Sequence, residues 1–269
     1  MLNRSIKYCI TIYIFSYKRI FPLKYIPEYK SKFFKIIKNI LENQLSQINY
    51  NKDIVKNALN NIKGYAVEDE QKRYLLKLLN LDSKLISQSR RFSYVHSIFT
   101  SRTIPLEEKE RLLNEEVKRD KNSKDSIEAK LMCKAALPDR KNNKLLWKKL
   151  TEESNSDSLA NMKEIMAGFA PVEQYDIVED FLIQKFFEVL PKFGKNSEMF
   201  FVNYFIAFMA PSQFTIDYII QKMDNLINEL KKDKDQCQIV RYLSEESDLM
   251  KRTKISREKC EKYLESIKK

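Results

Sequence analysis

The side chains that most often perform catalysis are scarce in this chain. His96 is its only histidine, and the cysteines, Cys9, Cys133, Cys237 and Cys260, are far apart and form no C-x-x-C pair. A zinc site of the H-E-x-x-H type needs two imidazoles on one helical face. Phosphate-binding and dinucleotide-binding loops need several clustered glycines, and the chain has 3 isolated ones. The sequence therefore predicts no catalytic residue, no metal ligand and no cofactor site.

His96 and Cys133 remain as candidates for nucleophilic chemistry, because the members of a catalytic triad meet in space rather than in sequence. His96 lies among the aromatic and β-branched residues of Tyr94–Phe99, so we expect a structural histidine that is hydrogen-bonded or half-exposed. Cys133 lies on a predicted helix whose apolar side includes Leu131. This position favours a buried and unreactive thiol.

Carboxylate pairs and a dense set of aromatic residues are also interpreted as structural. Neighbouring side chains on a helix diverge by about 100°, so adjacent carboxylates are expected on solvated faces. These pairs are Glu107/Glu108, Glu115/Glu116 and Glu245/Glu246. The aromatic residues recur at helical spacing and are expected in the core, not as a stacking platform for bases. They are Phe181, Phe186, Phe187, Phe200, Phe201, Tyr204, Phe205 and Phe208.

The composition favours an all-α protein. The chain has 269 residues and a mass of 32.1 kDa, and a chain of this length can bury roughly three quarters of the surface that it exposes when unfolded. Only 3 residues are Gly and 7 are Pro, whereas the tight turns of β-hairpins depend on Gly and on Asn-Gly pairs. We therefore expect helices joined by short polar links.

Apolar residues recur at helical spacing along most of the chain. The predicted helices cover 33–48, 53–62, 68–79, 105–119, 126–137, 143–153, 159–167, 172–190, 198–208, 214–231, 236–243 and 256–267. Residues 90–99 are interpreted as a short segment between helices, Ser123 as a helix cap, and Gly64 as the residue that ends the second helix. Because no strict repeat is visible, we expect an irregular α-solenoid-like superhelical array of antiparallel helix pairs, similar to armadillo or HEAT arrays.

The best break in the chain lies between Pro22 and Pro27. It predicts a basic and aromatic extension at 1–27 and a single helical domain at 28–269. Residues 1–63 contain twelve Lys or Arg and three acidic residues, so nine of the twelve net positive charges lie there. A partner such as nucleic acid or an anionic membrane would have to bind this segment. The rest of the chain is nearly balanced, so neither nucleic acid nor a membrane is the expected partner.

The cysteines and the hydropathy bear on localisation. Widely separated cysteines in a chain of this length are typical of free thiols in a reducing compartment. No stretch approaches the roughly 20 apolar residues that cross a bilayer. The segment Tyr8–Phe15 resembles a weak signal peptide, but no cleavage site of small residues follows it. We therefore expect a cytoplasmic protein.

One stretch carries a distinctive series of helix-boundary residues. Pro138 must end a helix, because proline disfavours the helical conformation of the residue before it, and Asp139 can cap the next helix. Trp147, the only tryptophan, is expected to form a large buried contact between helical layers. Gly168 is expected to adopt the left-handed conformation at a helix end, with Phe169 returning to the core.

The order and spacing of these residues resemble the C-terminal helical domain of zinc aminopeptidases of the aminopeptidase N, puromycin-sensitive and endoplasmic reticulum types (gluzincins). The resemblance lies mainly between Leu112 and Phe187, and it weakens before about Asp53 and after Pro211. Upstream, Arg91-Phe92 stands where the family often has Arg followed by an aromatic residue. The residues that carry the resemblance are Arg119, Asp120, Ala136, Pro138, Asp139, Lys144, Trp147, Gly168 and Phe169.

The resemblance implies a domain that covers the catalytic domain and shapes the peptide-binding cavity, while zinc-dependent removal of N-terminal residues takes place elsewhere. Its implied partners are a zinc aminopeptidase catalytic domain, in cis or in trans, and a peptide substrate. Since the zinc-binding motif is absent from this sequence, the chain alone is expected to be inactive. Two alternatives stay open: a stand-alone helical-repeat module that binds a peptide or protein, and a binder of anionic polymers or membranes through the basic N-terminal segment.

Overall fold

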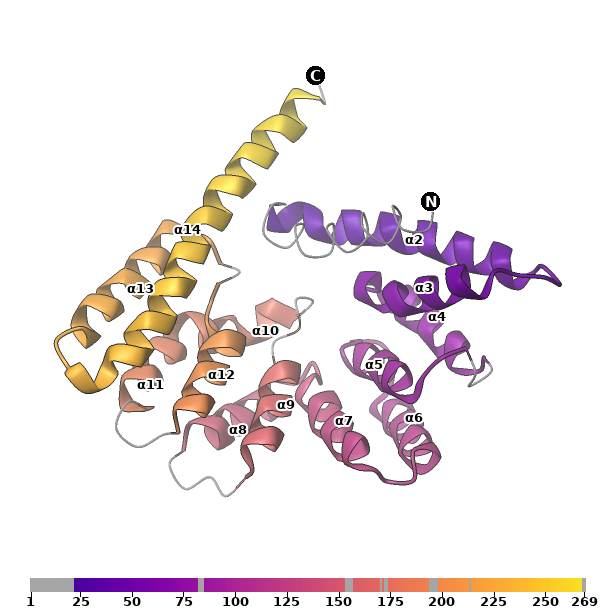
Figure 1. Ribbon diagram of the computed structural model, residues 1–269, viewed down its shortest axis with the longest axis horizontal. Coiled ribbons are helices and arrows are strands. Elements are labelled where there is room, and N and C mark those ends of the chain that lie inside the picture. Colours follow the sequence, from indigo (N-terminus) through magenta and orange to yellow (C-terminus); the bar gives the residue numbers. More distant parts are fainter. Residues whose placement is uncertain are drawn as a thin grey trace. The chain divides into compact units, whose positions relative to one another are not determined.

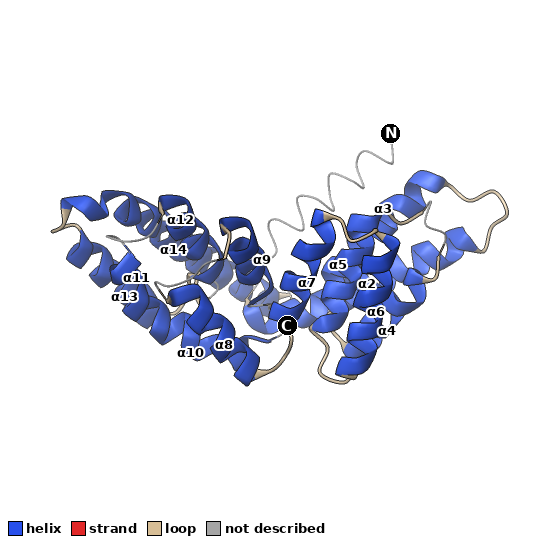
Figure 2. Ribbon diagram, turned by 90° about the horizontal axis from the view of Figure 1, so that it is seen from below, coloured by secondary structure: helices blue, strands red, loops and turns tan. Residues whose placement is uncertain are grey.

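The computed structural model describes residues 22–81, 85–152, 157–169, 171, 174–193, 198–212 and 214–267. Within these ranges every regular element is a helix and none is a strand (Figures 1 and 2), which confirms the predicted all-α class. The chain divides into two compact units: unit 1 contains the described residues from 23 to 138, and unit 2 contains those from 139 to 267. The division falls between Pro138 and Asp139, two of the predicted boundary residues. The solenoid arrangement remains a prediction.

Unit 1 is organised around helix α5. Its elements are η1 (Leu23–Tyr25), α2 (Ile26–Leu45), α3 (Lys52–Ile62), η2 (Lys63–Tyr65), α4 (Asp69–Leu79), α5 (Gln88–Phe99), α6 (Leu106–Arg119) and α7 (Lys124–Ala135). Helix α5 packs against α4, α6 and α7, and α2 packs against α3. The interpretation of residues 90–99 as a short segment was therefore wrong. Contacts with three helices bury α5 on several sides, so its sequence lacks a simple one-sided apolar stripe.

Unit 2 contains α8 (Arg140–Thr151), α9 (Leu159–Phe169), α10 (Tyr175–Asp180), the π-helical segment η4 (Phe181–Lys185), α11 (Phe186–Phe193), α12 (Met199–Met209), α13 (Asp217–Leu230), η5 (Lys234–Gln236) and α14 (Cys237–Ser266). Helix α12 packs against both α9 and α14, and α13 packs against α14 and α11. Helix α8 packs against α9 and α10. The helix predicted at 172–190 is therefore interrupted by a π-helical turn.

Helix α14 is one helix of 30 residues, not the two helices predicted at 236–243 and 256–267 (Figure 1). The intervening sequence is polar, which weakened the helical pattern. It nevertheless contains no Gly or Pro, and Ser247, Met250 and Thr253 are buried at intervals of three residues. This spacing keeps one face of the helix against the rest of unit 2.

Gly64 follows the end of a helix as predicted, whereas Gly168 does not. Gly168 lies inside α9, and Gly64 lies in η2, one residue beyond the Lys63 that follows α3. No described glycine has a positive φ, so the left-handed helix end expected at Gly168 is wrong, whereas α3 ends just before Gly64 as predicted. The left-handed residues of the described chain are Lys121 and Asn122, with φ of 54° and 57°, between α6 and α7. The described left-handed positions of the chain are therefore formed without glycine.

Candidate binding site

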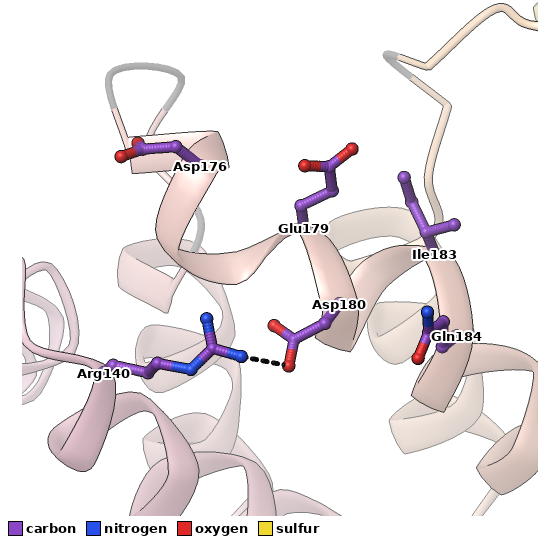
Figure 3. Close-up of a pocket in the computed structure, with 6 residues that line it drawn as sticks. All are labelled: Arg140, Asp176, Glu179, Asp180, Ile183 and Gln184. Atoms are coloured by element: carbon purple, nitrogen blue, oxygen red, sulfur yellow. Dashed lines mark hydrogen bonds and ion pairs between the residues drawn. The ribbon is translucent and has the colours of Figure 1, made fainter.

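An open pocket of about 250 Å³ lies in unit 2, where the start of α8 faces α10 and η4 (Figure 3). Arg140 is the first residue of α8. The other lining residues are Asp176, Glu179 and Asp180 of α10, and Ile183 and Gln184 of η4. The pocket therefore combines three carboxylates, a guanidinium group, a carboxamide and an aliphatic side chain.

An ion pair joins the two sides of this pocket. Arg140 Nη2 donates to Asp180 Oδ2 at 2.7 Å, and both side chains are partly exposed. The second oxygen of the same carboxylate, Oδ1, is shielded from solvent and accepts no hydrogen bond from the residues that the structure describes. Figure 3 shows this carboxylate facing Arg140, with Asp176 and Glu179 on the upper side of the view. One oxygen of Asp180 is thus held by Arg140, and the other is buried beside the pocket without a donor among the described residues.

The π-helical segment shapes one wall of the pocket. The backbone N–H of Phe186 donates to the carbonyl of Phe181, five residues earlier, so one residue is inserted relative to α-helical spacing. Lys222 of α13 donates to the carbonyl of Ile183 at 3.2 Å, and its ammonium lies 4.8 Å from the centre of the Phe187 ring. Single π-helical turns inside α-helices frequently occur at functional sites. This turn brings Ile183 and Gln184 to the same pocket as the carboxylates of α10.

Three of the predicted structural residues behave in unit 2 as expected. Asp139 caps α8 by accepting a hydrogen bond from the backbone N–H of Lys141 at 2.8 Å. Trp147 is buried, and its ring lies 5.4 to 6.0 Å from the rings of three phenylalanines. These are Phe169, Phe181 and Phe205, from α9, η4 and α12. Phe169 is completely buried, as predicted for the residue after Gly168, whereas Lys144 is exposed.

The predicted residues of unit 1 lie at the two ends of α7. Ser123 occupies the N-cap position, and Asp120 accepts a hydrogen bond from the Ser126 hydroxyl at 2.7 Å and another from Ser123. These hydrogen bonds lower the pKa of Asp120 below its usual value. At the other end, Ala136 is buried and Pro138 follows α7 after two residues. These residues therefore form the helix junctions on either side of α7.

The prediction that both members of the pair Glu115/Glu116 lie on a solvated face is wrong for Glu116. Glu115 is exposed, as predicted, but Glu116 is buried and forms a two-point ion pair with Arg91 of α5. The exposed Arg119 also approaches Glu116, with Nε 3.3 Å from Oε2. Glu116 and Arg119, from the region of the resemblance, therefore meet Arg91, from upstream of it, at the contact between α5 and α6.

His96 and Cys133 are not assembled into a catalytic arrangement. Cys133 is completely buried, as predicted, and burial raises the pKa of its thiol. Both ring nitrogens of His96 are shielded from solvent and have no hydrogen-bond partner among the described residues. Burial, together with the nearby charge of Lys63, lowers the pKa of His96 to about 3, so the imidazole is neutral. Of the two forms expected from the sequence, the hydrogen-bonded histidine is not observed, and the residue as a whole is partly exposed.

The aromatic cluster is only partly in the core. Phe181, Phe186, Phe187, Phe201 and Phe205 are buried as predicted. In contrast, Phe200 is 71% exposed and Phe208 is 37% exposed, so their assignment to the core was wrong. Phe200, the half-buried Tyr204 and Phe208 are spaced four residues apart along one side of α12. We call these three residues the α12 aromatic face. The ammonium of Lys163, on α9, lies 5.4 Å from the centre of the Tyr204 ring.

This pocket was not predicted from the sequence. Its acidic residues lie at i, i+3 and i+4 in a six-residue helix, and Arg140 is about forty residues away. The spacing of Asp176, Glu179 and Asp180 could have suggested one acidic helical face. No feature of the sequence predicted the π-helical turn that follows α10.

The described residues offer no group of three His, Cys, Asp or Glu side chains placed to hold a metal ion. Among the same residues, no helix is both long and apolar enough to cross a membrane. Cys133, Cys237 and Cys260 form no disulfide. Cys9 and most of the predicted extension at 1–27 lie outside the described residues.

Comparison with known proteins gave no assignment. No protein-family model matches the chain. A search of curated proteins gave no significant match either.

Proposed function

We propose that this chain is a non-catalytic helical module that binds an apolar segment of a peptide or protein, and that it acts in the manner of the C-terminal domain of zinc aminopeptidases. The binding role is proposed because the α12 aromatic face is exposed. The family is proposed because of the residues that resemble the aminopeptidase domain.

Helix α12 has an unusual combination of composition and exposure. None of its eleven residues is charged, and its buried side packs against α9 and α14. Helices that are apolar all round are normally buried all round. Yet Phe200 and Phe208 remain exposed, separated by one helical turn from Tyr204 on each side. Covering an aromatic side chain with apolar atoms contributes about 1.5–3 kcal/mol, so this face favours an apolar occupant.

The family is proposed from the order of the helix-boundary residues and from their roles in ending, capping and packing the helices. Pro138 and Asp139 separate two helices, and Asp139 caps the second. Trp147 and Phe169 then join α8 to α9 in the core. In this proposal the chain shapes the cavity that receives the peptide, and a zinc-containing catalytic domain in cis or in trans hydrolyses it. A stand-alone binding module is the second candidate, because the α12 aromatic face requires no peptidase.

The binding role is tested by replacing Phe200. Peptides from a random library would be selected on the immobilised full chain, and the affinity of the selected peptides measured by fluorescence anisotropy. We expect apolar and aromatic residues to be enriched, and Phe200→Ser to weaken binding by roughly tenfold or more. Tyr263→Ser is the matched control, because Tyr263 is an exposed aromatic residue on α14 in the same unit. Equal effects of both variants, or no selection of apolar peptides, would reject the role of α12.

A further inference from the structure

We propose that the exposed side of α2, together with the turn that follows this helix, binds the surface of an anionic membrane. Three isoleucines of this region are exposed, and we call Ile36, Ile40 and Ile48 the α2 isoleucines. Exposed lysines accompany them on α2 and α3. The proposal goes beyond peptide binding by α12 and does not depend on it.

The α2 isoleucines lie away from the side of α2 that packs into unit 1. Ile37 and Leu41 of the same helix are buried in the core, whereas Ile36 is 53% exposed and Ile40 is 42% exposed. Residues four apart in a helix lie on the same side, about one turn from each other. Ile48 lies in the turn between α2 and α3 and is 99% exposed. Aliphatic side chains therefore face solvent both along the helix and at its end.

The acidic residues of α2 are compensated by lysines of the same helix. Glu28 accepts a hydrogen bond from Lys32 at 2.7 Å, and the carboxylate of Glu42 lies 3.9 Å from the ammonium of Lys38. These are the acidic residues of α2. The helix thus presents no carboxylate that lacks a nearby cation.

The lysines that remain give this region a positive charge. Lys35 precedes Ile36, and Lys52 and Lys56 belong to α3, which begins four residues after Ile48. All three lysines are exposed, and none of them forms an ion pair with a residue that the structure describes. Asp53, the acidic residue of α3, offsets one of these charges. Residues 1–63 as a whole hold nine of the chain's twelve net positive charges.

An anionic bilayer suits both the isoleucines and the lysines. Its head groups attract lysine, and aliphatic side chains enter the boundary between head groups and acyl chains. Nucleic acid would neutralise the lysines but leave the isoleucines in water, since it is bound through phosphate contacts and by stacking on aromatic rings. A protein helix is normally received in an apolar groove, whereas Ile48 lies almost fully exposed in a turn. A lipid surface is therefore the occupant that these residues favour.

The experiment is sedimentation of the full chain with vesicles that contain phosphatidylserine and phosphatidylcholine in equal parts. Vesicles of phosphatidylcholine alone test the need for anionic head groups. We expect the chain to sediment with the anionic vesicles at about 0.1 M salt and to be largely released at about 1 M salt, where charges are screened beyond about 3 Å. Equal binding to both kinds of vesicle, or binding to neither, would overturn the proposal.

Serine substitutions test the α2 isoleucines. Ile48→Ser should lower the partition coefficient about tenfold, and Ile36→Ser about threefold, because less apolar surface is removed from water. The matched control is Ile127→Ser, since Ile127 of α7 is also 53% exposed and belongs to the same unit. Each position is exposed, and circular dichroism checks that each variant is folded. Equal losses with Ile36→Ser and Ile127→Ser, or no loss with Ile48→Ser, would contradict the proposal.

Glutamine substitutions test the lysines. Lys35→Gln and Lys52→Gln should each weaken binding about fivefold. Lys118→Gln removes the same charge from an exposed position on α6 of the same unit and should have a smaller effect. Equal weakening by all three would show a general effect of net charge. Loss with the lysine variants but not with Ile48→Ser would identify a surface for anionic polymers. Either result would contradict the proposal.

Phe200→Ser separates this surface from the α12 aromatic face. The variant should bind anionic vesicles like the wild-type chain, and Ile48→Ser should still select apolar peptides. Loss of vesicle binding in Phe200→Ser would place the lipid contact on α12 and overturn the role of α2. Failure of peptide selection on α12 would leave the vesicle result unaffected.

Discussion

Arg91 and Glu116 form a buried two-point ion pair between α5 and α6. Arg91 Nε and Nη2 each lie 2.6 Å from a different carboxylate oxygen of Glu116, and Nη2 also donates to the carbonyl of Leu79 at 2.7 Å. Both side chains are almost completely buried, with 2% and 5% of their surface exposed. The charges are thus satisfied mainly by each other, and this pair ties three helices of unit 1 together.

Removing one member of this pair is expected to destabilise unit 1 strongly. Glu116→Gln should lower the free energy of unfolding by about 3–5 kcal/mol, because it leaves the Arg91 charge buried without a counter-charge. Urea denaturation followed by circular dichroism measures this loss. The control is Glu115→Gln, which breaks an exposed ion pair with Arg111 of the same 2.6 Å length and should cost less than about 1 kcal/mol. Equal losses would contradict the account of the buried pair.

Gly64 is expected to be replaceable by alanine with a gain in stability. The position is exposed, its φ is not positive, and an added Cβ would meet no atom within 4 Å. Alanine restricts the unfolded chain, so Gly64→Ala should raise the free energy of unfolding by about 0.4–1 kcal/mol. A decrease measured by urea denaturation would mean that Gly64 needs its conformational freedom after all.

Lys109 gives the stability an identifiable dependence on pH. It is 3% exposed, its ammonium donates to the carbonyl of Ser101 at 2.5 Å, and burial lowers its pKa to about 8 despite the nearby charge of Asp69. The unfolded chain therefore binds more protons than the folded chain between pH 8 and about 10.4. Through this window Lys109 makes the free energy of unfolding rise with pH, by an amount on the order of 2 kcal/mol.

The Lys109 contribution is isolated by comparison with Lys109→Met. Tyr74, Tyr94 and Cys133 have raised pKa values, which make the fold less stable at alkaline pH, but they do so in both proteins. The difference between the wild-type and variant free energies of unfolding should therefore increase from pH 8 to pH 10.4 in favour of the wild type. A constant difference would show that Lys109 keeps its ordinary pKa.

Asp139 is expected to stabilise unit 2 through the first turn of α8. Asp139→Ala removes the hydrogen bond to the backbone N–H of Lys141 and should cost about 1 kcal/mol. Trp147 provides a specific signal, because it is the only tryptophan and lies in the core of unit 2. Denaturation followed by its fluorescence should show this loss for Asp139→Ala. The exposed Lys144→Ala should change stability by less than about 0.5 kcal/mol.

Much of the helical architecture was predictable because most boundaries are set by local chemistry. The capping position of Asp139 and the burial of Trp147 follow from side-chain types within a few residues. Helix α5 was missed because contacts with three helices bury it on several sides, and the continuous α14 was missed because its middle is polar. Glu116 shows the same limit. Its sequence context is that of a solvated helix, and only the contact with Arg91, 25 residues away, places it in the interior.

The candidate site was less predictable than the fold. Arg140 and Asp180 meet through the packing of α8 against α10, and the π-helical turn adds Ile183 and Gln184. The exposure of Phe200 also depends on tertiary packing. Phe201 and Phe205, which have the same spacing as Phe200 and Tyr204, are buried, because α9 and α14 cover the other side of α12. Periodicity identifies apolar positions, but it does not tell which of them remain uncovered.

The central claim, that this chain serves a zinc aminopeptidase without catalysing the reaction itself, is tested most directly by immunopurification. An antibody against residues 140–200 would recover the native protein from its source cells under non-denaturing conditions, and hydrolysis of aminoacyl substrates would be measured. The account predicts activity that chelators inhibit, whether the catalytic domain lies in the same polypeptide or in a partner, and no activity in the purified 269-residue chain. Native material without aminopeptidase activity, or chelator-sensitive activity in the chain alone, would contradict it.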